Sequence, residues 1–103
     1  MEHTGAGPEE LSIRHAESPD GGTFVIEQGG RRLGELVWSR GDAGEMIIEH
    51  TEVDEALRGR GAARMLVDAG VDFARRIGAK IAPVCPYAKK VLERDPTYRD
   101  VLR

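Results

Sequence analysis

The segment with the clearest chemical potential is a short glycine-containing loop in the middle of the chain. It reads Arg58-Gly59-Arg60-Gly61-Ala62-Ala63 and precedes a stretch with helical periodicity. A loop of small residues that opens a helix presents unpaired backbone N–H groups, and the helix dipole adds about half a positive charge there. Because Gly59 and Gly61 lack a Cβ, a ligand can approach the backbone closely. This pattern predicts a phosphate or pyrophosphate site.

Other interpretations of this loop are a plain strand-to-helix turn with surface arginines, a dinucleotide fold or a Walker P-loop. The dinucleotide fold is disfavoured because the spacing is not G-x-G-x-x-G and the helix follows four predicted strands. The Walker P-loop is excluded because no Lys-Ser/Thr pair follows the glycines. A plain turn stays open on the loop residues alone.

Two further side chains could transfer a proton or an acyl group. Cys85 precedes Pro86, which is well placed to begin a helix, and a helix N-terminus favours the thiolate. The cysteine could be a nucleophile, a proton donor or a buried pocket wall. His50 lies near the end of a predicted strand and could be a general base or a hydrogen-bonded structural histidine. On a regular strand Glu49 would point to the opposite face from His50.

The elements that must position these residues follow from hydrophobic periodicity. Alternating or β-branched stretches predict strands, Gly29-Gly30 predicts a hairpin, and Gly78 is placed to end the long helix. The predicted strands are 11–17, 23–28, 31–39, 45–53 and 80–84, and the predicted helices are 61–77 and 86–94, with a last helical turn at 98–102. Because a helix connects the last two strands, they should be parallel neighbours. We therefore expect a compact α+β fold with a mixed, mostly antiparallel sheet of about five strands and two main helices.

Length and composition limit the remaining possibilities. A chain of 103 residues accommodates one domain, which we expect at residues 10–103 after a loose tail at 1–9. The net charge of −3 argues against a nucleic-acid partner. No apolar run is long enough for a membrane helix, and residues 1–10 lack a signal pattern. The single cysteine fits the reducing cytoplasm, and the histidines lack metal-ligand spacing. We thus expect a cytoplasmic monomer or weak homodimer without a metal.

The segment at residues 53–67, VDEALRGRGAARMLV, resembles the cofactor motif of the GNAT acetyltransferase superfamily. That motif is Arg/Gln-x-x-Gly-x-Gly/Ala, and Arg58, Gly61 and Ala63 match it, with Val53 at the valine that precedes it. The chain also resembles the short YjdJ-type branch of the superfamily. The residues that carry this likeness are His50-Thr51, Cys85-Pro86-Tyr87-Ala88 and Asp95-Pro96-Thr97-Tyr98. Together the resemblance covers residues 11–102.

The resemblance implies that acetyl-CoA or CoA is the cofactor. Its pyrophosphate would lie on the N–H groups of Arg60 to Ala63, beside Arg58 and Gly59. Its pantetheine arm would run between the fourth and fifth strands and accept backbone hydrogen bonds from Glu52 and Val53. The Val53 N–H would also meet the acyl carbonyl. Tyr87 could stack on the cofactor or donate a hydrogen bond near the thioester, and it could equally pack under the sheet.

The implied activity is acetyl transfer to an amine, either on a small molecule or on a protein lysine or N-terminus. Many members of the superfamily carry a tyrosine acid after strand five, but Leu92 stands at that position here. Cys85 and His50 are therefore the catalytic candidates. A different class is a CoA-binding sensor or accessory module with little catalysis, which the missing tyrosine would suit. The third is a plain α/β interaction domain in which the loop has no ligand.

Overall fold

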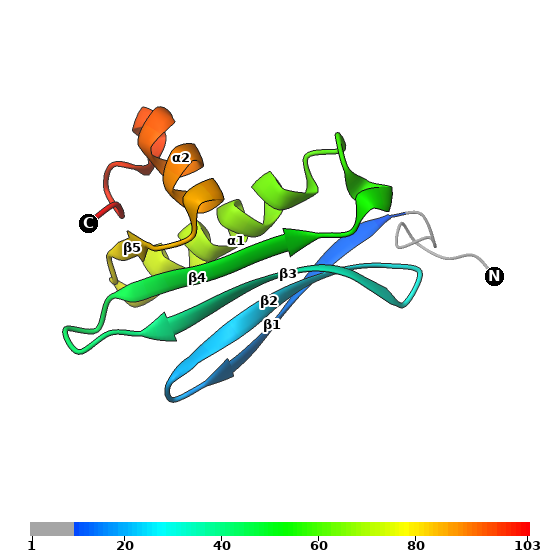
Figure 1. The fold of residues 1–103 in the computed structure, drawn as a ribbon. Helices are drawn as coiled ribbons and strands as arrows, with labels where there is room; N and C mark the ends of the chain where they lie inside the picture. Colours follow the sequence, from blue (N-terminus) through cyan, green and yellow to red (C-terminus); the bar gives the residue numbers. More distant parts are fainter. Residues whose placement is uncertain (1–9) are drawn as a thin grey trace.

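The computed structural model describes residues 10–103, and the expected tail at 1–9 lies outside the described residues. Five strands form one sheet in chain order, as Figure 1 shows. They are β1 (Leu11–Ser18), β2 (Gly21–Gln28), β3 (Arg31–Arg40), β4 (Met46–Val53) and β5 (Ile81–Pro83). β1 to β4 pair antiparallel and β5 is parallel to β4. The predicted mixed sheet, including its parallel pair, is confirmed.

Two α-helices and two short 3₁₀ helices complete the domain. These are η1 (Glu55–Leu57), α1 (Ala62–Ile77), α2 (Pro86–Arg94) and η2 (Pro96–Tyr98). Gly78 ends α1 with a φ of 71° and donates its N–H to the Ala74 and Arg75 carbonyls, a typical glycine C-terminus. In residues 10–103 no helix is both long and apolar enough to cross a membrane.

The end of the chain forms two successive turns. The first is η2, where the Asp95 carboxylate accepts hydrogen bonds from both the backbone N–H and the hydroxyl of Thr97. The second lies at the predicted position, because the Tyr98 carbonyl accepts hydrogen bonds of 3.1 Å from the N–H groups of both Val101 and Leu102. Leu102 then forms a parallel bridge to Ile81, so the last residues lie beside β5.

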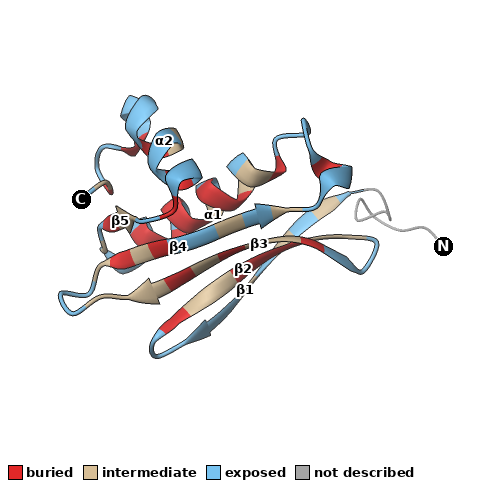
Figure 2. Cartoon of the chain, viewed as in Figure 1, coloured by how far each residue is buried: buried red, intermediate tan, exposed pale blue. Residues whose placement is uncertain are grey.

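The core lies between the sheet and α1. Figure 2 shows buried segments in the strands of the sheet and along α1, and the core residues include Leu36, Ile48 and Leu66, each 0% exposed. Gly70 lets the helix approach β4, because a Cβ built there would lie 3.3 Å from the Met46 Cε atom. The opposite face of the sheet, here called the outer face, carries ion pairs such as Arg14–Glu27.

A histidine joins the aromatic part of this core. The His15 ring stacks on Phe24 with centroids 3.8 Å apart and meets the edge of Phe73 at 4.6 Å. Its Nε2 atom accepts a hydrogen bond of 3.1 Å from the buried indole of Trp38. An accepting Nε2 carries no proton, so the contact requires a neutral imidazole.

A bulge in β4 changes which side chains share a face. Val37 pairs with His50 but Trp38 pairs with Ile48, so Glu49 is the extra residue. A bulge interrupts the two-residue alternation of side chains. Glu49 accepts a 2.6 Å hydrogen bond from Ser39 on the outer face, the face that also carries His50. The expectation that Glu49 and His50 point to opposite faces is therefore wrong.

Candidate active site

The loop before α1 is shaped by glycines in a left-handed conformation. Gly59 has a φ of 80° and Gly61 a φ of 73°, which side chains with a Cβ adopt only with strain. Gly61 is the N-cap of α1 and supplies no side-chain cap, and the first turn contains no acidic residue. The first-turn N–H groups of Ala62, Ala63 and Arg64 find no backbone acceptor in the described part of the chain. The positive end of α1 thus faces the loop without an internal anion.

One of the expected backbone donors is already used. The Arg60 N–H donates a 3.1 Å hydrogen bond to the Leu57 carbonyl at the end of η1. This turn bends the chain from β4 into α1, so the Arg60 amide cannot also serve an anion. The donors that remain begin at Gly61.

A cleft of about 290 Å³ opens at this loop, and we call it the loop cleft. Its walls come from the end of β4, the loop, the first turn of α1 and the start of α2. They are Val53, Leu57, Arg58, Gly59, Gly61, Ala62, Ala63, Arg64 and Tyr87. Of the predicted cofactor residues, all but Glu52 and Arg60 line it. Leu57 and Arg64 were not predicted, since their position depends on the fold of η1 and α1.

Next to this cleft β5 no longer pairs with β4, which leaves that edge of β4 open. The two strands pair only over Met46–Ile81, Ile47–Ala82 and Ile48–Pro83. Beyond them, the N–H groups of Val84 and Cys85 both donate to the Ile48 carbonyl, each at 2.9 Å. The strands then separate, and β4 continues to Val53 without β5 beside it.

The register of β3 and β4 decides which amides face this open edge. The Asp54 N–H donates a 2.7 Å hydrogen bond to the Leu33 carbonyl, and Glu35 stands opposite Glu52. Hydrogen-bonded pairs alternate along an antiparallel ladder. The backbone of Glu52 is therefore directed at β3, while Thr51 and Val53 present theirs to the open edge. The Glu52 N–H, which was expected to face this edge, is thus directed away from it, and the Thr51 N–H faces it instead.

The two predicted catalytic side chains lie on opposite faces of β4. Cys85 is buried at 5% exposure, and its thiol donates a 3.6 Å hydrogen bond to the Thr51 hydroxyl. His50 lies on the outer face, where its Nε2 atom is 3.3 Å from a Glu52 oxygen and 3.6 Å from a Glu35 oxygen. The structure does not bring Cys85 and His50 together.

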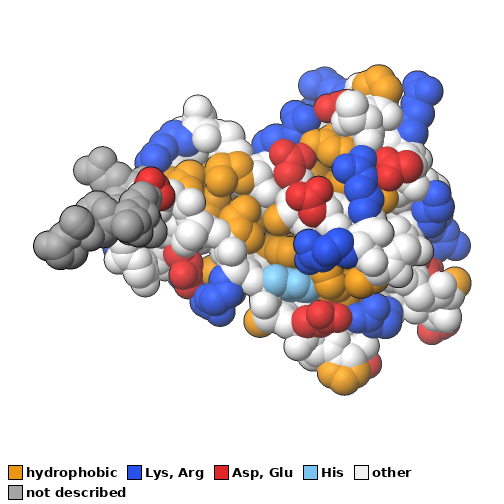
Figure 3. All heavy atoms as spheres, turned by 180° about the vertical axis from the view of Figure 1, so that it is seen from behind, with side chains coloured by type: hydrophobic (Ala, Val, Ile, Leu, Met, Phe, Trp, Pro, Cys, Tyr) orange, Lys and Arg blue, Asp and Glu red, His pale blue; other side chains and the backbone are white. Residues whose placement is uncertain are grey.

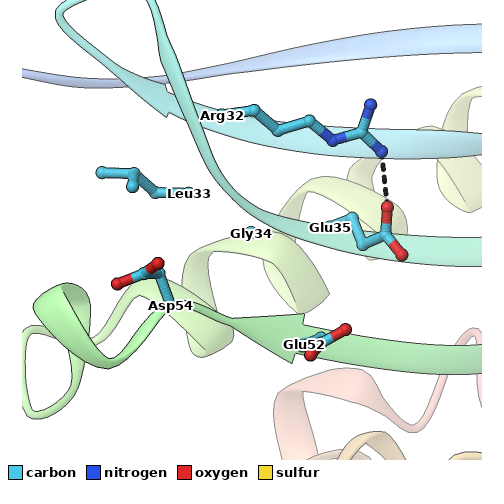
Figure 4. A pocket seen from close by; sticks show the side chains of 6 residues that line it. All are labelled: Arg32, Leu33, Gly34, Glu35, Glu52 and Asp54. Atoms are coloured by element: carbon cyan, nitrogen blue, oxygen red, sulfur yellow. Dashed lines mark hydrogen bonds and ion pairs between the residues drawn. The ribbon is translucent and has the colours of Figure 1, made fainter.

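The outer face carries an acidic pocket next to His50. Its volume is about 310 Å³, and its walls are Arg32, Leu33, Gly34, Glu35, Glu52 and Asp54. Figure 4 shows the ion pair between Arg32 and Glu35, with Glu52 on β4 and Asp54 just past the end of that strand. This excess of negative charge favours a cationic ligand such as an ammonium group.

Potential metal ligands come together at the same place. The ligand atoms of Glu35, His50 and Glu52 lie within 4.8 Å of one another, the one such group among residues 10–103. Sequence spacing gave no sign of this cluster, because it is formed across neighbouring strands.

A second tyrosine is held beside α1 and does not replace the missing acid. The Tyr98 hydroxyl donates to Asp68 and accepts a 2.9 Å hydrogen bond from Arg64. Burial and the bond to Asp68 raise the Tyr98 pKa. The hydrogen bond to Tyr98 also raises the Arg64 pKa. Leu92, at the position expected for a tyrosine acid, is buried at 1% exposure.

The chain is similar to known proteins in sequence. A family model described as GCN5-related N-acetyl-transferase matches residues 23–101. Protein NATD1 of Mus musculus is 30% identical over 87 residues, which cover 84% of this chain and 68% of that protein. The Xenopus tropicalis NATD1 is 39% identical over 49 residues, or 48% of this chain and 45% of the relative. The matched segment thus spans less than half of the frog protein.

Solved structures agree with the fold. A solution structure of a GCN5-like putative N-acetyltransferase from Staphylococcus aureus is 32% identical, with a TM-score of 0.71 and coverage of 89% of this chain and 87% of the other. AAC(6')-Iy in complex with a bisubstrate analog, CoA-S-monomethyl-acetylneamine, has a TM-score of 0.67 over 84% of this chain and 89% of that one. Its identity of 15% shows the fold alone.

Proposed function

Because the chain belongs to the GCN5-related N-acetyltransferase family, we propose that it transfers the acetyl group of acetyl-CoA to an amine. The observation that carries this proposal is the loop cleft, whose uncapped helix N-terminus lies next to the open edge of β4. An anion and an extended arm can be bound there side by side. The short YjdJ-type branch is the placement that the His50-Thr51 and Cys85-Pro86 pairs favour.

The residues of the loop cleft fit a pyrophosphate. The amides of Gly61 to Arg64 would donate to its oxygens, and Arg58 and Arg60 add formal charge. AAC(6')-Iy, which shares the fold, has been seen in complex with CoA. The pantetheine arm would pair with Thr51 and Val53 as an added strand, since those residues face the open edge of β4.

Bound acetyl-CoA supplies the thioester carbonyl that the amine attacks. The Val53 N–H, which faces the open edge of β4, would donate a hydrogen bond to the developing oxyanion, an interaction whose loss typically costs about 3 kcal/mol of transition-state stabilisation. The Cys85 thiol is the candidate donor of a proton to the leaving sulfur. His50 is the candidate acceptor of the ammonium proton, because its Nε2 atom lies beside the acidic pocket, 3.6 Å from a Glu35 oxygen and 3.3 Å from a Glu52 oxygen.

The acceptor amine would approach from the outer face. The pocket lined by Glu35, Glu52 and Asp54 attracts an ammonium group and adjoins the end of β4. A small-molecule amine and a protein lysine or N-terminus both carry this charge. The acceptor class is therefore a cationic amine.

A CoA-binding sensor is the second candidate, and buried Leu92 at the position of the usual acid favours it. Two measurements separate the candidates. Acetyl-CoA should raise the melting temperature in both cases, whereas release of free CoA thiol with a panel of amines is expected only from the enzyme. Stabilisation without turnover would favour the sensor. No stabilisation by acetyl-CoA or CoA would contradict both.

A further inference from the structure

The unpaired cations of this protein are unevenly distributed. Half of the arginines have an anionic partner, as in the Arg14–Glu27, Arg64–Asp95 and Arg75–Asp100 pairs. Among the described residues, seven cations make no ion pair, side-chain hydrogen bond or ring contact. They are Arg31, Arg58, Arg60, Lys89, Lys90, Arg94 and Arg99. Most of this group lies on the loop before α1 and on α2, and Figure 3 shows Lys and Arg side chains gathered at the end of the molecule that holds α2.

A second cleft connects these cations to the loop cleft. It has a volume of about 470 Å³ between α1, α2 and η2, and we call it the α2 cleft. Its walls are Arg64, Tyr87, Lys90, Val91, Arg94, Asp95 and Pro96. Arg64 and Tyr87 also line the loop cleft. A ligand held at the loop can therefore continue into the α2 cleft.

The one carboxylate of the α2 cleft is already neutralised. Asp95 accepts hydrogen bonds from the Thr97 N–H and hydroxyl and pairs with Arg64 at 2.9 Å. These hydrogen bonds and Arg64 lower the Asp95 pKa, so it stays ionised and paired. Lys90 and Arg94 have no such partner. The cleft thus offers two free positive charges on a protein of net charge −3, which suits a second phosphate group.

The identity of this second phosphate group follows from the proposed function, on which the present inference rests. CoA carries its pyrophosphate between a pantetheine arm and an adenosine 3′-phosphate. If the pyrophosphate lies at the loop and the pantetheine follows β4, the adenosine must leave the loop cleft elsewhere, and the α2 cleft adjoins it. Tyr87, 39% exposed, offers a ring between the two clefts. We propose that Lys90 and Arg94 bind the 3′-phosphate and make the protein selective for CoA over 3′-dephospho-CoA.

The test is calorimetric titration of CoA and 3′-dephospho-CoA into the whole protein at low ionic strength. The wild type should bind CoA about 10- to 100-fold more tightly, since each charge-assisted contact contributes roughly tenfold. The double variant Lys90→Gln/Arg94→Gln should bring this ratio close to one by weakening CoA alone. Arg31→Gln/Arg99→Gln removes the same charge from unpaired arginines that line neither cleft, and it should leave the ratio unchanged.

Two results would overturn the inference. One is an equal affinity of the wild type for the two ligands, and the other is an unchanged affinity ratio in the Lys90/Arg94 variant, whether both affinities stay the same or fall equally. Circular dichroism checks that each variant is folded. Failure of the proposed function looks different, because the wild type would then bind neither ligand, and the inference would fall with it.

Discussion

Gly61 is the residue at which the cofactor proposal can be tested most directly. Its φ of 73° requires a left-handed backbone, and a Cβ there would meet no atom within 4 Å. A side chain at this position would therefore project into the loop cleft without disturbing the core. Glycine here serves both the turn and the approach of a ligand.

We expect Gly61→Glu to abolish measurable CoA binding, because a carboxylate would clash with the pyrophosphate and repel it. Gly30→Glu is a matched control, since Gly30 has a φ of 81°, also meets nothing within 4 Å and lies on the β2–β3 turn. Both variants should lose about 1–2 kcal/mol of stability through backbone strain. Titration of CoA into the folded variants decides the outcome, and undiminished affinity of Gly61→Glu would remove the pyrophosphate site.

Cys85→Ala should retain CoA affinity and lose acetyl transfer. A positioned proton donor typically contributes 10²- to 10⁴-fold to the rate, and the thiol already points its hydrogen at Thr51. Initial rates of CoA thiol release, with affinity measured separately, give the comparison. Bound CoA should also protect Cys85 from alkylation.

Full activity of Cys85→Ala would show that the thiol only lines the pocket, and His50 would then be the remaining catalytic candidate. Alkylation at the same rate with and without CoA would show that the cofactor does not cover this residue. Thr51→Val is the companion variant, because it removes the acceptor of the thiol proton and leaves the sulfur in place.

At the scale of elements, local sequence patterns predicted the helices well, whereas features that depend on the geometry between strands could not be predicted. Helical spacing and Gly78 predicted α1 to within a residue, and Pro86 marked the start of α2. The bulge at Glu49 depends on the register of β3, so no periodicity within β4 could reveal it. The same holds for the acidic pocket, whose carboxylates come from two strands.

The candidate site divides in the same way. The loop residues of the cleft follow from one contiguous motif, and so most of them were predicted. The parts proposed for Arg64, Thr51 and Lys90 could not be predicted from the sequence, because they depend on how α1, β4 and α2 meet. The Arg60 N–H was expected to bind the pyrophosphate, but it donates a hydrogen bond to the Leu57 carbonyl at the end of η1. The sequence does not reveal this hydrogen bond.

The packing of α1 on β4 gives a prediction for Gly70. Gly70→Val should lower the free energy of unfolding by about 1–3 kcal/mol, because the added atoms press on Met46 and the strand behind it. Gly70→Ala should stay within about 1 kcal/mol of the wild type, since the helix propensity of alanine offsets a small shift of the flexible Met46 end. Urea unfolding measures both. Equal stabilities for valine and alanine would mean that the contact is looser than described.

At the scale of the whole molecule, His15 links stability to pH. Burial lowers its pKa below 6.5, and Arg76 acts in the same direction while Glu17 opposes both. Arg40, over the Trp38 ring at 5.0 Å, is a further cation nearby. Protonation would break the bond from Trp38 and leave its indole N–H buried without an acceptor.

Since the folded pKa of His15 is the lower one, the unfolded chain binds its proton first. The stability contributed by neutral His15 is complete above about pH 6.5 and is lost as the pH falls through the folded pKa. Urea unfolding between pH 7.5 and 5 should show this decline. His15→Gln should show a smaller slope across the same range, and an identical slope would assign the dependence to other groups.

The short ladder between β4 and β5 also determines which part of the molecule can open locally. Only three residue pairs join β5 to the sheet. The chain that follows buries Ala88, Leu92, Tyr98 and Val101 in the core, and ion pairs at Arg64–Asp95, Arg75–Asp100 and Arg103–Glu45 add to this attachment. Such a segment can open without unfolding the β1–β4 meander. Its amides should therefore exchange with deuterium sooner than those of β2 and β3, and added salt should widen the difference by screening the ion pairs. CoA bound between the two parts would close this local opening, so that protection of α2 from exchange would report occupancy of the cleft from a distance.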